Sequence, residues 1–259
     1  MNNNDNLLKV ERQSYIRKLV EDEGRAAVPD LSAHFDVSEA TIRRDLEELD
    51  GKGWVRRTHG GAVRAERASK EPPMVQRKSE QKNEKQQIGK AAANIVKEGQ
   101  TIFFGSGTTV LEVVIHLPED IKLTVITNSL PVVNHLADYP NVELIVIGGM
   151  LRHNELSMVG HIAEHAVREF RADIVIIGMH AIDSHHGVTN DYLPETMTDR
   201  AIMGIAPKVI VVADHTKFGR VSSVLVATVT AAHMLITDQK APKDSIQEMR
   251  ELGVEVLQI

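Results

Sequence analysis

The sequence GSGTT at residues 105–109 has the residue types that bind a phosphate. It follows an apolar run and precedes a helical pattern, so its small residues, free N–H groups and hydroxyls can hold an anion at a helix N-terminus. It is neither a dinucleotide fingerprint nor a P-loop, because Val110 replaces the third glycine and no Gly-Lys pair follows. The candidate phosphate ligands are Ser106, Gly107, Thr108 and Thr109.

Three further loops offer polar groups of a similar kind. Asp214 places a carboxylate three residues before the ammonium of Lys217, a pair that can bind a sugar hydroxyl and a phosphate or form a local ion pair. Thr127-Asn128-Ser129 and Gly148-Gly149 offer hydrogen-bonding groups and close backbone approach, but each alone is equally typical of an ordinary turn. The local residues leave these alternatives open.

Histidines raise the alternative of a metal sensor. Neutral imidazoles together with Asp183 and Asp191 have the chemistry to bind Zn²⁺. No fixed helical ligand spacing is present, so loop histidines that hydrogen-bond a ligand or the backbone are the favoured interpretation, and we expect no metal and no cofactor. The histidines in question are His180, His185, His186 and His215.

A different chemistry is indicated near the N-terminus. Residues 38–49 predict a helix with a buried stripe, which leaves the opposite arc outside. In a helix-turn-helix the start of such a helix enters the DNA major groove, and nearby arginines reach bases or phosphates. A solvated charged helix face is the alternative. The predicted DNA-contacting residues are Ser38, Glu39, Ala40, Thr41, Arg43, Arg44, Arg56, Arg57 and His59.

The elements that position this face follow from the pattern. Leu7 to Glu23 has helical periodicity, and Pro29 to Phe35 begins with a first-turn proline. Ser38 is a good N-cap for a third helix, Glu39 to Leu49. Two short strands, 54–57 and 62–64, predict a wing around the turn His59-Gly60-Gly61 that lies along the phosphate backbone.

The remainder of the chain alternates between helical and strand patterns. Residues 66–81 contain Pro72-Pro73 and almost no apolar periodicity, so they predict a linker. Beyond it, short β-branched runs between helices predict a mostly parallel sheet covered on both faces. The predicted strands are 101–104, 123–127, 142–147, 173–177, 209–213, 234–237 and 254–257, and the predicted helices are 82–96, 108–116, 130–137, 160–170 and 195–205.

Composition narrows the function classes. The chain of 259 residues has no cysteine, which excludes disulfides and thiolate metal sites, and its apolar runs are too short to span a bilayer. We therefore expect a cytoplasmic protein without a membrane partner. The formal net charge is −6, but residues 52–70 carry six basic side chains and one acid. This asymmetry predicts a nucleic-acid-binding end joined to an acidic body.

These blocks, taken in order, resemble the DeoR family of bacterial transcription regulators. VSEATIRRDLEEL and RRTHGGAV look like its N-terminal signature, and EKQQIGKAA, GSGTT, VITNSLPVV, IGGMLR, GHIAEHAVREFRADIVIIG, AIDSHHGVT and DHTKFGR match blocks of its sensor domain. The resemblance implies a winged helix-turn-helix at 1–65, a linker at 66–81 and, at 82–259, an α/β sensor domain similar to ribose-5-phosphate isomerase.

The resemblance also implies a function. A member of this family represses a carbohydrate catabolic operon by binding double-stranded operator DNA and leaves it when a phosphorylated sugar or related metabolite binds. It forms dimers or tetramers, and symmetric homo-oligomers are expected on general grounds. The residues that the family motifs place around the effector are Lys85, Ser106, Gly107, Thr108, Thr109, Asn128, Asp214 and Lys217.

Two positions depart from the family pattern. Gly105 stands where the family commonly has an aspartate, and Asp199 stands where a lysine often precedes the arginine matched by Arg200. Losing one acid and gaining another predicts an altered effector. A sugar-phosphate isomerase is the main rival, but the chain has no G-x-S-x-G or H-E-x-x-H motif and no paired carboxylates at Asp183-Ser184, so we expect a binding protein.

Overall fold

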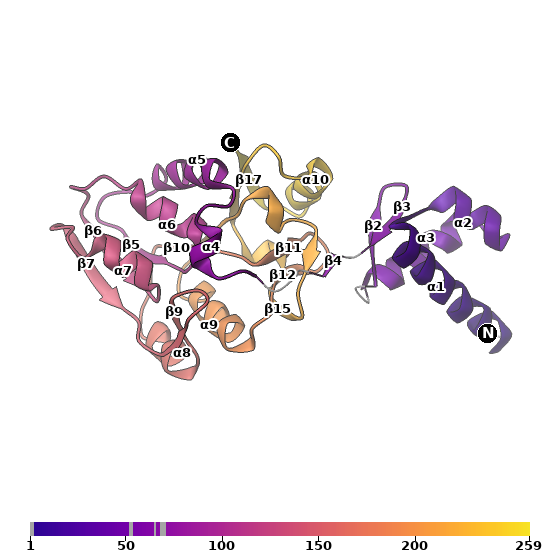
Figure 1. The fold of residues 1–259 in the computed structure, drawn as a ribbon, viewed down its shortest axis with the longest axis horizontal. Coiled ribbons are helices and arrows are strands. Elements are labelled where there is room, and N and C mark those ends of the chain that lie inside the picture. The colour runs from indigo at the N-terminus through magenta and orange to yellow at the C-terminus, as the bar shows by residue number, and fades with distance from the viewer. Residues whose placement is uncertain (1–2, 52–53, 65, 68–70) are drawn as a thin grey trace. The chain divides into compact units, whose positions relative to one another are not determined.

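The computed structural model describes residues 3–51, 54–64, 66–67 and 71–259 and divides the chain into two compact units, Met1–Arg67 and Ala68–Ile259. Figure 1 labels the helices and strands of both units. Lys52 and Lys70 of the predicted basic segment, and residues 68–70 of the predicted linker, lie outside the described residues. No helix within the described ranges is long and apolar enough to cross a membrane.

The N-terminal unit is a three-helix domain with a small antiparallel sheet, as the sequence predicted. Its core joins the three helices through the stripe Ile42, Leu46 and Leu49, which is fully buried together with Ile16 and Leu31. The elements are α1 (Asn3–Glu23), β1 (Arg25–Ala27), α2 (Val28–Phe35), α3 (Glu39–Gly51), β2 (Val55–Thr58), β3 (Gly61–Arg64) and β4 (Glu66–Arg67).

Two strands of this unit were not predicted, β1 and the two-residue β4, which falls within the predicted linker. β1 pairs with β3, which also pairs with β2, so the sheet order is β1-β3-β2 and β3 is the central strand. Three residues are too few to show an alternating pattern in the sequence. The pairing also corrects the predicted turn: Gly61 belongs to β3, opposite both Ala27 and Thr58, and the turn is His59-Gly60.

The C-terminal unit contains a seven-stranded sheet in the order β17-β16-β13-β10-β5-β6-β7, and every pair of neighbouring strands is parallel. The chain begins at β5 and adds β6 and β7 on one side, then returns to add β10, β13, β16 and β17 on the other. The strands are β5 (Thr101–Phe104), β6 (Leu123–Thr127), β7 (Val142–Val146), β10 (Ile174–Gly178), β13 (Lys208–Val212), β16 (Met234–Thr237) and β17 (Glu255–Gln258).

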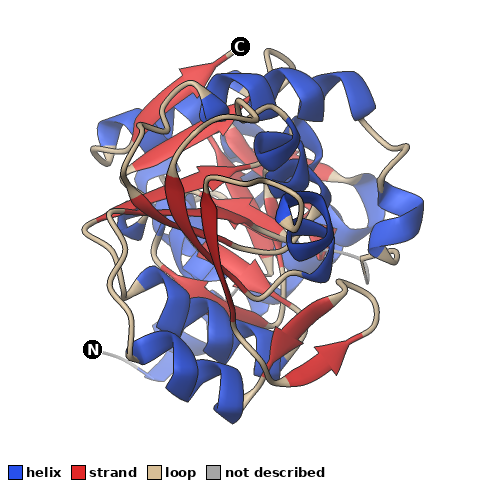
Figure 2. Ribbon diagram, turned by 90° about the vertical axis from the view of Figure 1, so that its left-hand side faces the viewer, coloured by secondary structure: helices blue, strands red, loops and turns tan. Residues whose placement is uncertain are grey.

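Helices cover both faces of this sheet, as Figure 2 shows. Alternate strand residues enter different cores: Phe104 packs in one and its neighbour Phe103 in the other. The first core contains side chains of α5, α6 and α7, and the second those of α8, α9 and α10. These helices are α5 (Lys82–Ala93), α6 (Thr108–Ile115), α7 (Leu130–Leu136), α8 (His161–Arg168), α9 (Leu193–Met203) and α10 (Lys243–Glu251).

The predicted elements of this sheet are all present with ends shifted by a few residues, while several short elements were missed. Two small antiparallel sheets, β8-β9 and β11-β12-β15, lie outside the main sheet. Their strands have three or four residues each, below the length at which a pattern is informative. The remaining elements are β8 (Met150–Arg152), β9 (Ser157–Val159), β11 (Ala181–Asp183), β12 (Gly187–Asn190), η1 (His215–Lys217), β14 (Arg220–Val221), β15 (Val224–Ala227) and η2 (Val229–Ala231).

The predicted linker is wrong in its second half. Within residues 71–81 the chain forms the short helix α4 (Met74–Arg77), whose first and last side chains are buried in the C-terminal unit. The Met74 N–H donates to the carbonyl oxygen of Asn154 at 2.7 Å. Polar composition predicted a linker, but an arginine can be buried in a folded unit when carboxylates pair with it.

Gly61→Ala should destabilise the N-terminal unit by about 1–3 kcal/mol. A Cβ at position 61 would overlap the Ala26 carbonyl oxygen and lie 2.9 Å from the Ala27 Cα, so β1 would have to move away from β3. Gly60→Ala is the matched control, since nothing lies within 4 Å of a Cβ there. Urea unfolding of both variants measures the difference, and equal midpoints would contradict the close packing of β1.

Candidate DNA-binding face and effector pocket

The start of α3 has the geometry of a capped and exposed recognition helix. The Thr41 N–H donates to Ser38 Oγ at 3.2 Å, which confirms the predicted cap. Ser38, Glu39 and Ala40 are exposed and Thr41 is half-buried. The predicted outer arc of α3 is therefore open to a ligand over its first turn.

The two arginines of α3 differ in their surroundings. Arg43 Nη2 pairs with Glu39 Oε2 at 2.7 Å on the exposed helix surface, so part of its charge is already neutralised. Arg44 is exposed, and none of the described residues forms a hydrogen bond or ion pair with it. Arg44 is the better placed of the two to bind an external phosphate or base.

Buried carboxylates hold this face in position. Asp45 is buried and receives hydrogen bonds from Arg12 and, at 3.3 Å, from Gln13, which ties α1 to α3. Asp50 accepts the Arg57 N–H at 3.0 Å and so joins α3 to the wing. Arg56 and Arg57 are half-buried in β2, and His59 is exposed at the wing turn. All nine predicted DNA-contacting residues thus lie on α3 or the β2–β3 hairpin.

The second site is a pocket at the carboxyl ends of β5, β10 and β13. β5 and β10 are the neighbours at which the strand order reverses, and such a switch point is where open α/β sheets bind ligands. Its free volume is about 40 Å³. The lining side chains come from the loops after these strands, from α9, from the segment around α4, from the β8–β9 loop and from the end of β12.

The loop after β5 brings free donors to the pocket. Gly107 has φ +113°, a conformation that favours glycine, and as N-cap of α6 it offers no capping side chain. The first N–H groups of α6 and the hydroxyls of Thr108 and Thr109 therefore meet the pocket. Gly105 packs on β10, where a Cβ would lie 3.0 Å from Ile177 Cγ1. The position at which the family commonly has an aspartate is therefore in close contact with the sheet.

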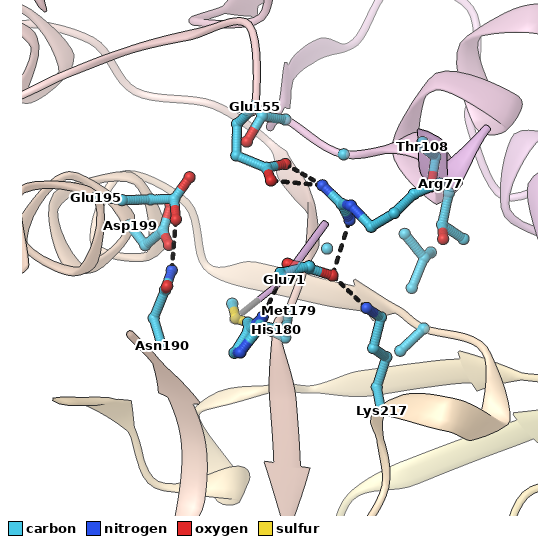
Figure 3. A pocket seen from close by; sticks show the side chains of 16 residues that line it. Glu71, Arg77, Thr108, Glu155, Met179, His180, Asn190, Glu195, Asp199 and Lys217 are labelled. Carbon is cyan, nitrogen blue, oxygen red and sulfur yellow. Dashed lines mark hydrogen bonds and ion pairs between the residues drawn. The ribbon is translucent and has the colours of Figure 1, made fainter. Parts of the chain in front are cut away.

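A cluster of charges fills one end of the pocket (Figure 3). The Glu71 carboxylate receives Arg77 Nη1 at 2.8 Å and lies 2.8 Å from His180 Nδ1, and it also pairs with the Lys217 ammonium. Burial alone raises the pKa of Glu71, but the hydrogen bond with His180 and the charges of Lys217 and Arg77 outweigh it and lower the pKa to about 2. Glu71 is therefore ionised at neutral pH.

Arg77 continues the cluster toward a second carboxylate. Its Nη2 lies 2.5 Å from each oxygen of Glu155, and both side chains are buried. Burial raises the pKa of Glu155, although the charge of Arg77 opposes the shift. One guanidinium thus bridges two buried acids, which leaves few of its donors for a ligand in this state.

The opposite end of the pocket is acidic. Asn190 Nδ2 donates to Glu195 Oε2 at 2.7 Å, and Arg152 pairs with the same carboxylate. Burial raises the pKa of Asp199 to about 7, although the charge of Arg152 and a hydrogen bond from Asn190 lower it. A carboxyl that titrates near neutral pH can donate a hydrogen bond to a ligand as well as accept one.

Five of the eight predicted effector residues line the pocket: Ser106, Gly107, Thr108, Thr109 and Lys217. The other three do not line it and have internal partners. Lys85 Nζ donates to the Arg77 and Glu80 carbonyl oxygens at 2.8 and 2.7 Å. Asp214 accepts the Thr216 N–H at 3.0 Å and caps η1, and Asn128 Nδ2 donates to the Met158 carbonyl oxygen at 2.9 Å.

Other lining residues were missed as effector ligands. Glu71 and Arg77 were assigned to a linker, and no local pattern marks them, because the contacts that bury them span up to 146 positions in the sequence. Asp199 could have been found, since it departs from the family pattern at a helix that reaches the pocket. His180 was singled out only for the metal alternative. Its Nε2 is buried and has no hydrogen-bond partner among the described residues.

The candidate metal ligands do not converge. His186 Nδ1 lies 2.9 Å from Asp183, and His215 Nδ1 lies 3.0 Å from Asp238, while His180 pairs with Glu71. Over the part of the chain that the structure describes, no three His, Cys, Asp or Glu side chains are grouped to hold a metal ion. Each imidazole instead faces a carboxylate of its own.

Comparison with known proteins assigns the family. Residues 80–239 match the model of the DeoR C terminal sensor domain, and residues 12–68 match that of the DeoR-like helix-turn-helix domain. The chain belongs to the DeoR family. It is a DNA-binding transcription regulator with an N-terminal helix-turn-helix and a C-terminal sensor domain, rather than an enzyme.

Curated relatives match nearly the full chain. The HTH-type transcriptional regulator GlpR of Haloferax volcanii is 35% identical over 97% of this chain and 98% of its own length. The glycerol-3-phosphate regulon repressor of Escherichia coli K12 is 32% identical over 96% and 98%, and the transcriptional repressor AccR of Agrobacterium fabrum is 35% identical over 88% and 89%. Ribose 5-phosphate isomerase A of Methanocaldococcus jannaschii aligns to 53% of this chain and 54% of its own, at 17% identity and a TM-score of 0.39.

Asp199→Asn should change the pH dependence of sensor-domain stability. The pKa of Asp199 rises on folding from its ordinary value of 3.8 to about 7, so the folded state holds an extra proton between these values and loses stability as pH rises through them. Wild type should therefore become less stable relative to the Asn variant from about pH 4 to about pH 7, with no further change above. Thermal unfolding across this range measures it, and a constant difference between the two proteins would contradict the shift.

Proposed function

We propose that the protein represses a carbohydrate catabolic operon by binding double-stranded operator DNA, and that a phosphorylated sugar or related metabolite releases it. The observation that supports this most directly is the pocket at the strand switch point, which has a cationic end and an acidic end. Two of the relatives described above are named as repressors, one of them of a glycerol-3-phosphate regulon.

The phosphate belongs at the cationic end. Lys217 and Arg77 supply positive charge there, and the N-terminus of α6 with Thr108 and Thr109 supplies hydrogen-bond donors. The hydroxyl groups of the ligand then face Glu195 and the other carboxyl groups of α9, which accept hydrogen bonds. The pocket thus suits a small molecule that is anionic at one end and hydroxylated at the other.

The remaining predicted effector residues act on the pocket through the residues that line it. Lys85 joins the end of α4 to α5 and so fixes Arg77, and Asp214 fixes the turn that carries Lys217. Asn128 holds the start of α7 to β9. We assign these three to positioning rather than to direct contact.

On the DNA side, two copies of the helix-turn-helix must read successive half-sites, so we propose a homodimer or tetramer located with the DNA in the cytoplasm. The first turn of α3 faces the base edges, and Arg43, Arg44, Arg56, Arg57 and His59 bind phosphates or bases. Effector binding shifts subunit packing and moves the paired modules out of register with the half-sites.

A mobility shift assay tests the proposal with DNA from upstream of the protein's own gene and a panel of sugar phosphates and glycerol 3-phosphate, at fixed salt. We expect release by one phosphorylated compound and not by its dephosphorylated form. Thr109→Val should raise the concentration needed for release by about tenfold, because it removes a hydroxyl that bonds a charged group.

Thr230→Val is the matched control for this variant, since Thr230 is exposed and outside the pocket lining. Operator binding without ligand, measured in the same assay, identifies a folding defect. Specific DNA binding that no phosphorylated compound alters would remove the phosphate site from the proposal and leave the DNA-binding face.

Arg44→Ala should weaken operator binding by about 1–3 kcal/mol, or reduce the salt slope by about one if Arg44 contacts a phosphate. Arg44 is exposed on the outer arc of α3. Arg171→Ala, an exposed arginine of the sensor domain, is the control for the loss of one positive charge. Unchanged affinity and salt dependence for Arg44→Ala would show that the reading face lies elsewhere.

A further inference from the structure

The Glu71 carboxylate lies where the anionic group of a ligand would bind. It faces Arg77, His180 and Lys217, the positively charged or donor side chains at that end of the pocket (Figure 3). The Glu71 side chain is only 11% exposed, so it is held inside the sensor domain rather than on its surface. A group of the protein itself therefore satisfies the cations that a phosphate would need.

The free space in the pocket supports the same conclusion. About 40 Å³ of the pocket is open to the centres of water molecules, whereas pockets for small ligands usually measure about 300–1,000 Å³. Departure of a side chain from the pocket would therefore make room for a phosphorylated sugar. Glu71 is the one whose departure both opens space and frees Arg77 and Lys217.

We propose that Glu71 is an internal substitute for the effector's anionic group, and that the effector's phosphate displaces it from a subsite formed by Arg77, Lys217 and His180. This rests on the proposed function, because it specifies how the effector of that same pocket acts. The subsite would take a phosphate monoester or a similar oxyanion, and Glu71 would compete with it.

Charge and hydrogen bonding favour the exchange. A phosphate monoester carries about 1.5–2 negative charges and three acceptor oxygens, against one charge and two oxygens for a carboxylate. His180 Nε2, buried without a hydrogen-bond partner among the described residues, gives a larger ligand a contact that Glu71 does not use. The subsite should therefore bind the phosphate more strongly than it binds the Glu71 carboxylate.

Displacement has a direct consequence along the chain. Glu71 is the fourth residue after Arg67, the last residue of the DNA-binding unit. Arg77 holds this segment twice, since its Nη1 binds Glu71 and its Nε donates to the Pro72 carbonyl oxygen at 2.9 Å. A phosphate that takes over the guanidinium weakens both anchors.

The proposed release of DNA by the effector implies that the state with Glu71 bound in the pocket favours operator binding, and that the phosphate-bound state favours release. By linkage, weakening the Glu71 contact should tighten phosphate binding and loosen DNA binding together.

Calorimetric titration of inorganic phosphate into the full-length protein tests the competition. Glu71→Gln keeps the size of the side chain but removes its charge, and we expect it to bind phosphate about tenfold more tightly than wild type, since the subsite is no longer occupied by an anion. Glu84→Gln is the matched control: Glu84 pairs with Lys240 outside the pocket, and its variant should bind phosphate like wild type.

Each other outcome is decisive. If wild type binds phosphate and Glu71→Gln binds it equally or more weakly, Glu71 is not a competitor and the inference fails, while the phosphate pocket of the proposed function stands. If no protein binds phosphate, the subsite of Arg77 and Lys217 is not an anion site, and the proposed phosphate pocket fails with the inference. Glu71→Ala, checked by thermal unfolding, repeats the measurement if the Gln variant does not fold.

The coupling to DNA is measured separately. Glu71→Gln should bind the operator without ligand more weakly than wild type, because the state that favours DNA is less populated. Tighter phosphate binding with unchanged operator affinity would confine the role of Glu71 to competition within the pocket and overturn its link to DNA release.

Discussion

Charges that leave water have to be compensated, and this constraint organises the sensor domain. Burying an ion costs several kcal/mol of free energy. A buried charge is therefore tolerated only when a partner of opposite charge lies in good geometry. Arg77 satisfies the requirement twice, between Glu71 and Glu155, and Lys217 balances the remaining charge of Glu71. The pocket is therefore electrostatically complete without a ligand. In the proposed exchange, a ligand offers the same cations a better anion, so the site would select for charge before shape.

The sheet explains why these groups meet. Parallel strands deliver their following loops to one edge, and the reversal of strand order between β5 and β10 separates two of those loops enough to leave a pocket. The loop after β5 contributes hydrogen-bond donors, and the segment after β13 contributes Lys217. Helix α9 contributes Asp199 and Glu195, which accepts a hydrogen bond from Asn190. The cationic end and the acidic end of the pocket thus lie side by side because the strands end side by side.

The DNA-binding unit uses buried carboxylates for a different purpose. Asp45 and Asp50 are buried and hydrogen-bonded, and they fix α1 and the wing to α3. The side chains that would meet DNA remain on the surface, where Arg44 has no partner among the described residues. Internal charges determine geometry in this unit, and exposed charges are left for the ligand. In the sensor domain, by contrast, the internal charges are themselves the site.

Local periodicity and turn residues a few positions apart were enough to predict the two units, the helix-turn-helix, the parallel sheet and the GSGTT loop. Lys217 and the unusual Asp199 were also marked in the sequence. The folded chain was needed to show that Glu71 and Arg77 belong to the pocket and that Lys85 and Asp214 support it from outside. The reason is physical: the polar composition around Pro72 predicts exposure, whereas burial of those charges depends on partners far away in the sequence, such as Glu155 and Lys217. The residues that neighbour a buried ion in the sequence do not show which distant residue will neutralise its charge.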